Sequence, residues 1–419
     1  MFTPGIDQIA EDLKTTENVV IGATTGFVVM LGVGPLVLAP LSETFGRRKL
    51  YMVCFTIFTL LQVPTALSPN VETLIAVRTI SGFFGSVGIA NGGGTISDMF
   101  HPHERAGVFG WYLLGPLLGP ALGPLFGGII VQDLGWRWVF WILTIICGIN
   151  TLFGFVFLKE TYAPIILSQR KDYYNRNKPG HYHFKGEDDR PLKAKLGHSM
   201  LRPLKILFTQ PIVFTMATYQ AIIFATMYSL YTNFQDIWGD GYGFSTTQVG
   251  LMYLGPGLGF LVAVWFIIPR IDTVYNHLTE MNDGEAEPEF RLPLANIGAV
   301  LIPLSLFAFA WMVQFHVHWF PTILSTFFFG IGQVTIFNTV QNYYIDSFSQ
   351  YAASAIAAGA VFRSFFGGVV PLAAPTIFEK LGWGWGLSIF GFTSLALSPS
   401  PLLFFYFGEK IRTRYAIEL

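Results

Sequence analysis

The sequence predicts an all-α membrane protein, because most of the chain consists of long apolar runs that short polar segments separate. Hydrophobic residues make up 52% of the 419 residues and charged residues only 12%, whereas a soluble domain usually carries about 25% charge. A helix needs roughly 20 apolar residues to cross a bilayer, and a barrel strand only about ten of alternating polarity. The runs of helical length number eleven: 19–42, 50–71, 73–97, 106–132, 138–158, 206–235, 245–269, 292–315, 319–345, 350–378 and 383–407.

The same composition excludes several classes of protein. The basic residues form no aromatic-interleaved patch on a soluble module, so we expect no nucleic-acid partner. Cys54 and Cys147 both lie in apolar runs, where cysteine usually serves as a small apolar residue. A membrane enzyme would need a cluster of His, Asp or Glu, but His101 and His103 form one isolated pair and His316 and His318 another on the opposite side, with no acidic helix face to join them. We therefore expect a protein that is not an enzyme, uses no cofactor or metal, and has the lipid bilayer as its surroundings.

The distribution of basic residues predicts the orientation. They collect in the 42–49 loop, in the C-terminal tail and in the segment 159–205, which holds eleven basic residues against five acidic ones. The connections on the other side carry almost none, so the positive-inside rule places these three segments in the cytosol. The connection 270–291 fits poorly, because its acidic residues outnumber its arginines. Acidic residues count little in the rule, so the topology stands.

The basic segment also divides the chain. Five runs precede it and six follow it. We expect an N-terminal transmembrane bundle at 1–158, a cytosolic central linker at 159–205 and a C-terminal transmembrane bundle at 206–419, a layout typical of transporters built from repeats.

The fourth run contains the most specific pattern, GWYLLGPLLGPALGPLFGG at 110–128. Gly115, Gly119, Gly123 and Gly127 recur every four residues and share one helix face, onto which another helix can pack closely. Three prolines at the same spacing remove backbone donors, so we expect this helix to bend. The alternative is a helix–helix contact with no further role.

This pattern resembles the antiporter motif of drug exporters in the major facilitator superfamily. In that family the motif lies on the fifth of twelve helices, at the interface between two bundles. The fixed positions of the motif are filled here by Gly110, Gly119, Gly123, Pro124, Gly127 and Gly128.

More specifically, the chain resembles the fungal drug:proton antiporters. The resemblance implies the two-bundle major facilitator fold and a monomeric exporter of the plasma membrane that expels small organic molecules in exchange for protons. Members of the family expel xenobiotics or the cell's own secondary metabolites, and a few carry polyamines.

A second motif of the family lies at 39–51, APLSETFGRRKLY. It resembles the loop between family helices two and three, which helps to lock the outward-facing state. The resemblance implies gating roles for Glu43, Gly46, Arg47 and Arg48, although Glu43 stands where the family usually has aspartate. The simpler role of the two arginines is to anchor the loop in the cytosol.

Three residues are candidates for a proton relay. Residues 74–85 resemble the fourth-helix motif of the family, in which the arginine, here Arg78, is linked to proton transfer. An arginine within the membrane is costly, so we expect Arg78 and Arg363 to face the protein interior. Snorkelling to the outer interface is the alternative for Arg78. Asp98 lies at a helix end, where it could equally be an ordinary interface residue.

Polar side chains that interrupt the runs 206–235 and 319–345 indicate either a substrate cavity or hydrogen bonds between helices. The candidates for lining a cavity are Tyr228, Tyr231, Gln333, Asn338, Gln341 and Asn342.

The first residues, MFTPGIDQIAEDL, resemble the outer loop that normally follows the first helix of the family. We therefore expect eleven of the twelve helices and weak transport by the chain as written. No acidic residue lies in the middle of any run, so the sequence does not identify a coupling carboxylate. The alternatives to an exporter are a truncated product that does not transport and a substrate sensor on the same fold.

Overall fold

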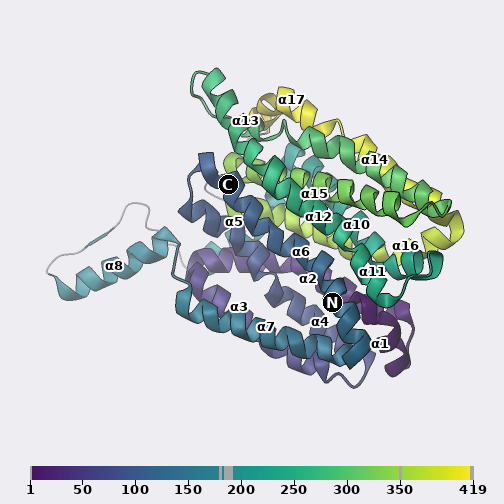
Figure 1. Ribbon diagram of the computed structural model, residues 1–419. Helices are drawn as coiled ribbons and strands as arrows, with labels where there is room; N and C mark the ends of the chain where they lie inside the picture. Colours follow the sequence, from purple (N-terminus) through teal and green to yellow (C-terminus); the bar gives the residue numbers. More distant parts are fainter. Residues whose placement is uncertain (1, 179–181, 184–191, 349–351, 416–419) are drawn as a thin grey trace.

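The computed structural model describes residues 2–178, 182–183, 192–348 and 352–415. Throughout these residues the regular structure is helical, without strands, which confirms the all-α class. Figure 1 shows the earlier helices, in purple and blue, on one side of the bundle and the later ones, in green and yellow, on the other.

The first half of the chain begins with two short helices and continues with long ones. In order they are η1 (Thr3–Gly5), α1 (Ile6–Asp12), α2 (Glu17–Phe45), α3 (Arg47–Ala66), α4 (Val71–Gly85), α5 (Val87–Met99), α6 (Pro102–Leu134), α7 (Trp136–Phe157) and α8 (Ala163–Asn177).

The reversals between these helices have local causes. Gly46, between α2 and α3, has a φ of +98°, a conformation that side chains disfavour, so the chain can reverse within one residue. At the opposite end Asn70 precedes α4, and its side chain accepts a hydrogen bond of 2.9 Å from the Thr73 amide, which caps the helix.

The second half is built in the same way. In order it contains α9 (Leu192–Thr209), α10 (Pro211–Thr232), η2 (Gln235–Gly241), α11 (Thr246–Met252), α12 (Leu254–Val262), η3 (Ala263–Ile267), α13 (Ile268–Met281), η4 (Pro288–Arg291), α14 (Ala295–Gln314), α15 (Trp319–Ser347), α16 (Ala352–Leu397) and α17 (Ser400–Arg414). The elements η2 and η3 are π-helical: η2 ends the span 211–241, and η3 joins α12 to α13 within the span 246–281.

Ten helical segments of the described chain are long and apolar enough to cross a membrane, where the sequence predicts eleven. The two counts differ only at the last segment, 354–414, which contains both of the last two predicted runs. Within it Gly382 is not helical, with φ +72° and ψ 170°, so the long α16 turns at this residue. The first nine segments each coincide with one predicted run.

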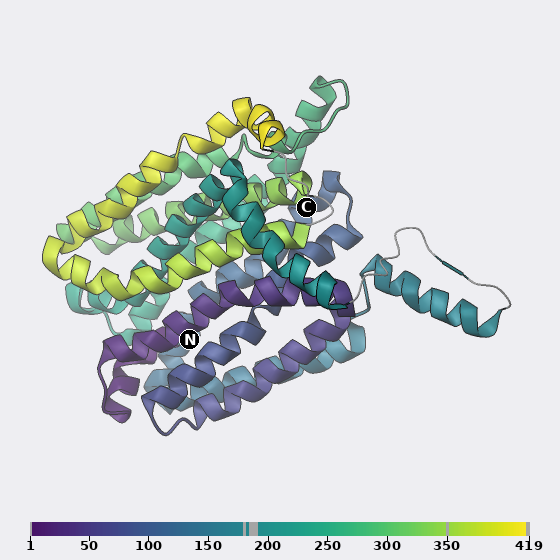
Figure 2. The ribbon, with the colours of Figure 1, turned by 180° about the vertical axis from the view of Figure 1, so that it is seen from behind.

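The two halves of the chain pack against each other along two seams. Within the first half α2 packs on α4 and α3 packs on α7, and within the second half α10 and α14 pack on α16. Between the halves α2 contacts α16 (Figure 2), and α6 contacts α11, α12 and α13. Helices that are distant in sequence therefore enclose the middle of the molecule.

The segment expected to be a cytosolic linker is partly helical. Helix α8 projects away from the bundle in both views (Figures 1 and 2). Helix α9, by contrast, packs on α2, α10 and α16. Within the expected linker, Arg202 and Pro203 of α9 are buried, while 184–191 lies outside the described residues.

The outside of the bundle is apolar. On α7 the side chains of Leu152, Val156 and Phe157 are 67%, 73% and 68% exposed. A helix that presents large apolar side chains outward needs lipid as its solvent. The fold therefore agrees with a multi-pass membrane protein.

Candidate functional site

A cavity of about 770 Å³ lies between the two halves of the chain. One side of its wall comes from α2 and α4–α7, and the other side from α10, α15 and α16. Its volume falls in the range of sites that hold drug-sized organic molecules. The aromatic side chains on the wall are Phe27, Phe109, Tyr112, Phe224, Tyr228 and Phe337.

Two of the six side chains predicted for a cavity lie on this wall, namely Tyr228 of α10 and Gln341 of α15. The ring of Tyr228 packs on Phe224, with 4.8 Å between the ring centres. The sequence analysis did not single out Asn150 of α7, which also lines the cavity. Asn150 is a polar side chain that interrupts an apolar run. The same criterion that selected the candidates on α15 could therefore have selected Asn150.

The other four predicted side chains are buried in contacts elsewhere in the second half. The Gln333 amide nitrogen lies 3.1 Å from the sulfur of Met227. Asn342 donates to the side-chain oxygen of Asn338 at 2.8 Å. None of these is among the described residues that line the cavity. Tyr231 likewise packs in the apolar core of the second half. Of these contacts only the one between Gln333 and Met227 joins two helices, as the alternative of hydrogen bonds between helices requires. The bond between Asn342 and Asn338 lies within α15, and the buried Tyr231 hydroxyl has no partner among the described residues.

The two membrane arginines face the protein interior, as expected. Arg363 of α16 lies on the cavity wall, is 6% exposed, and has its guanidinium carbon 5.2 Å from the ring centres of both Phe224 and Phe337. Arg78 of α4 is 8% exposed and lies behind the wall, with its guanidinium carbon 4.4 Å from the Phe27 ring centre. Their roles in proton transfer stay predictions.

Arg78 is enclosed by aromatic rings that come from the beginning and from the end of the sequence of the first half. Besides Phe27, the rings of Phe2 and Phe140 lie 5.3 Å and 5.6 Å from its guanidinium carbon. Such rings attract a cation through their faces and shield it from lipid. The start of the chain therefore contributes directly to the surroundings of this arginine.

The glycine motif of α6 has two environments along its length. At Gly110 a Cβ atom would lie 2.6 Å from Ile268 Cγ2, and at Gly128 one would lie 3.3 Å from the Thr246 carbonyl oxygen, so α13 and α11 pack closely there. At Gly119 nothing lies within 4 Å of the Cβ position, and this residue lines the cavity. The expectation of one continuous packed face is therefore wrong at Gly119, because this part of α6 faces the cavity.

The last part of the motif is buried. Gly123, Pro124 and Gly127 are inaccessible in α6, and a Cβ atom at Gly250 of α11 would lie 3.4 Å from the Pro124 carbonyl oxygen. Close approach here depends on a glycine of the partner helix as well as on those of the motif.

The residues of the loop motif form a network at the end of the bundle that bears residues 46–49, which we call the basic end. Arg47 donates from Nε to the Asp98 carboxylate at 3.2 Å and also donates to the Ser42 hydroxyl. The Glu160 carboxylate accepts the Arg47 and Arg48 amides at 2.9 Å and 3.2 Å. Asp98, a candidate for the proton relay, is therefore the ion-pair partner of Arg47.

Two small residues make room for this network. A Cβ atom at Gly46 would lie 2.4 Å from a Glu160 oxygen, and one at Gly94 of α5 would lie 2.7 Å from Arg47 Nη2. Glu43 is partly buried and interacts electrostatically with Arg47 and with Arg202 of α9.

A second network at the basic end, in the other half, was not foreseen. Arg291 is fully buried and forms ion pairs of 2.7 Å with both Asp272 and Asp346. Asp272 also accepts the amide of Gly107 in α6 at 2.9 Å, so it links the two halves. Burial by itself lowers the pKa of Arg291, but its interactions with Asp346 and Asp272 raise that pKa above its usual value. In the sequence, the acidic residues of the 270–291 connection stood out only because they disagree with the positive-inside rule. Nothing in the sequence indicated that they form ion pairs.

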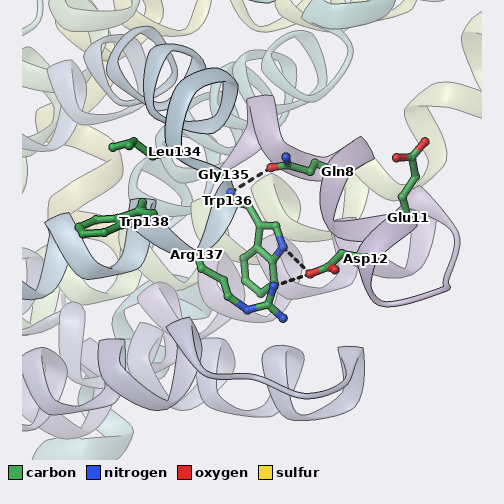
Figure 3. A pocket seen from close by; sticks show the side chains of 8 residues that line it. All are labelled: Gln8, Glu11, Asp12, Leu134, Gly135, Trp136, Arg137 and Trp138. Atoms are coloured by element: carbon green, nitrogen blue, oxygen red, sulfur yellow. Dashed lines mark hydrogen bonds and ion pairs between the residues drawn. The ribbon is translucent and has the colours of Figure 1, made fainter.

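The opposite end of the bundle carries a smaller pocket of about 590 Å³ between α1 and the start of α7 (Figure 3). The Trp136 amide donates to the Gln8 side chain at 2.9 Å, and the Trp136 indole donates to Asp12 at 3.0 Å. Arg137 also donates to Asp12. These hydrogen bonds from Trp136 and Arg137 lower the pKa of Asp12. They attach α1 to the turn between α6 and α7.

Comparison with known proteins agrees with this architecture. The family model of the Major Facilitator Superfamily matches residues 1–371. The MFS-type transporter penM of Penicillium rubens is 39% identical over 99% of this chain and 82% of its own length. The efflux pump radE of Floropilus chiversii is 37% identical over 100% of this chain and 79% of its own length.

A solved structure shows the same fold at low identity. The xylose transporter XylE of E. coli, in a partially occluded inward-open conformation, is 13% identical, with a TM-score of 0.65 over 97% of this chain and 94% of its own. The family match, the relatives and the fold agree on a transporter and not an enzyme. This chain belongs to the major facilitator superfamily.

Proposed function

We propose that this chain exports small organic molecules in exchange for protons, by exposing the cavity alternately to the two sides of the membrane. The observation that carries the proposal is the cavity itself, whose wall is shared by both halves of the chain. A site shared in this way can open to one side or the other when the halves rock against each other. The printed name of one relative, an efflux pump, supports export as the direction.

The halves proposed to move are residues 1–158 and 206–419, joined by the linker 159–205. The positive-inside rule favours a cytosolic basic end. The plasma membrane is the proposed location, because the resemblance to fungal exporters implies it. The hydrogen bond from the Gly107 amide to Asp272, which joins the two halves at the basic end, would then form in one state and break in the other. Arg78, Asp98 and Arg363 are the proposed members of the proton relay.

Xenobiotics or a self-made secondary metabolite are the proposed substrates, and the cavity disfavours polyamines. A polyamine carries several positive charges, whereas the described residues that line the cavity include the cation Arg363 and no carboxylate. Like charges in a water-poor cavity repel strongly. We propose that the protein acts as a monomer, because the cavity is formed within one chain.

Transport by purified protein in vesicles tests the proposal. The full chain is reconstituted, and uptake of fluorescent aromatic compounds of negative, zero and positive charge is measured with an imposed proton gradient, acid inside. We expect at least one compound to accumulate, and a protonophore to abolish the accumulation.

The control is Gly119→Trp, which directs a large side chain into the cavity from a position where a Cβ atom meets nothing within 4 Å. Equal accumulation by the wild type, by this variant and by protein-free vesicles would refute transport. Accumulation that ignores the proton gradient would refute proton exchange alone.

A further inference from the structure

The cavity has a single formal charge on its described wall. Of the residues that line it, Arg363 is the only one that is charged at neutral pH. Its side chain is almost fully buried between Phe224 and Phe337, which lie against its guanidinium group. A buried charge is unfavourable unless something pairs with it.

No hydrogen bond or ion pair joins the guanidinium group of Arg363 to another of the residues that the structure describes. Aromatic faces interact with the flat faces of a guanidinium group, whereas its five N–H donors point outward in the plane. Nε of Arg363 is buried without an acceptor among the described residues. Arg47 and Arg291 differ, because Arg47 is paired with Asp98 and Arg291 with two aspartates. Nε of Arg78 is also buried without an acceptor among the described residues, but Arg78 is not among the residues that line the cavity.

We propose that Arg363 binds the acidic group of the substrate, and that the substrates are aromatic acids with a planar apolar body and one negative charge. A carboxylate matches the edge of a guanidinium group, since it can accept two parallel hydrogen bonds from it. The aromatic rings of the wall, such as Phe224 and Tyr228, suit the planar body. The inference rests on the proposed function, because it takes the cavity as the substrate site.

The same arrangement selects against other molecules. A neutral aromatic compound would fill the cavity but leave the guanidinium donors without acceptors, and buried unpaired donors are costly. An aromatic cation would add repulsion by Arg363 to that cost. The expected order of affinity is therefore acid first, alcohol second and amine last.

Binding of three matched probes to the purified full chain tests the assignment. The probes are 2-naphthoate, 2-naphthylmethanol and 2-naphthylmethylammonium, which share one aromatic body and differ in charge. Binding is measured by equilibrium dialysis in detergent at neutral pH. We expect 2-naphthoate to bind at least about tenfold more tightly than the alcohol, as is typical for a hydrogen-bonded charge pair.

Two substitutions locate the effect. Arg363→Gln should reduce the affinity for 2-naphthoate to that for the alcohol, whereas Arg363→Lys should keep a preference for the acid. The matched control is Lys380→Gln, which removes an exposed positive charge from the same helix and should leave all three affinities unchanged.

The wild-type protein alone can overturn the proposal. If the alcohol or the amine binds as tightly as 2-naphthoate, Arg363 does not select for acids, whether or not the variants fold. Unchanged 2-naphthoate binding by a folded Arg363→Gln protein would overturn it as well. If 2-naphthoate binds through Arg363 but is not transported in vesicles, the site assignment stands and the export function fails.

Discussion

Substitutions of the motif glycines of α6 can distinguish the glycines that line the cavity from those that pack against another helix. At Gly119 a Cβ atom meets nothing within 4 Å and the residue lines the cavity, so Gly119→Trp directs a large side chain into the cavity. A tryptophan side chain occupies roughly 170 Å³ at protein packing density. This is about a fifth of the 770 Å³ cavity. We therefore expect Gly119→Trp to abolish transport while it leaves the protein folded.

The opposite result is expected at Gly110. A Cβ atom there would lie 2.6 Å from Ile268 Cγ2, so Gly110→Leu overpacks the contact between α6 and α13. Overpacking typically destabilises by about 1–3 kcal/mol. Replacing glycine within a helix gains at most about 1 kcal/mol of helix propensity, so the clash dominates at Gly110 and the gain remains at Gly119.

Thermal unfolding in detergent and transport in vesicles, measured on the same preparations, decide between these expectations. The control is Gly148→Leu on α7, where the nearest atom lies 3.8 Å from the Cβ position and the residue does not line the cavity. We expect Gly110→Leu to lower the melting temperature, and Gly119→Trp and Gly148→Leu to leave it near the wild type. Active transport by Gly119→Trp, or a lower melting temperature for it than for Gly110→Leu, would refute the reasoning.

Three further outcomes are expected. The pKa of Asp12 is lowered in the folded protein by its hydrogen bonds with Trp136 and Arg137. These bonds therefore stabilise the folded state at pH values above the ordinary pKa of aspartate. This stability is lost as pH falls through the lowered pKa, and the melting temperatures of wild type and Asp12→Asn should converge below about pH 4. Arg47→Gln should cost about 3 kcal/mol in thermal unfolding by leaving Asp98 unpaired, and Asp98→Asn in the same chain should recover part of it. Arg78→Gln should abolish proton-dependent efflux. The variant should still insert into the membrane, which membrane fractionation measures.

The membrane positions of the helices could be predicted because the bilayer imposes a simple requirement. Each pass needs about 20 apolar residues, so spans can be counted without knowledge of their neighbours. The one difference in count arises at Gly382, where the chain turns within a helix that is otherwise continuous. The basic loop at 46–49 could be recognised for the same reason, since charge is confined to the ends of spans.

The ion pairs of the acidic connection 270–291 could not be predicted from the sequence. By composition it is only a poor fit to the charge rule, yet Asp272 pairs with Arg291, and Glu289 pairs with Arg412 at 3.0 Å. The pair between Glu289 and Arg412 joins segments 123 residues apart. Pairing over such distances depends on how helices assemble, and composition does not encode that assembly.

By itself the sequence determined the class of protein, the approximate spans and the family, because hydropathy and short motifs are local properties of the chain. Only the tertiary structure decided which polar side chains face the cavity. Gln341 reaches it while Asn338 and Asn342, on the same helix, bond to each other, and Arg363 lines it while Arg78 lies behind Phe27. The physical reason is that a polar residue in an apolar helix must be satisfied somewhere, but its partner is set by the rotation of that helix against its neighbours.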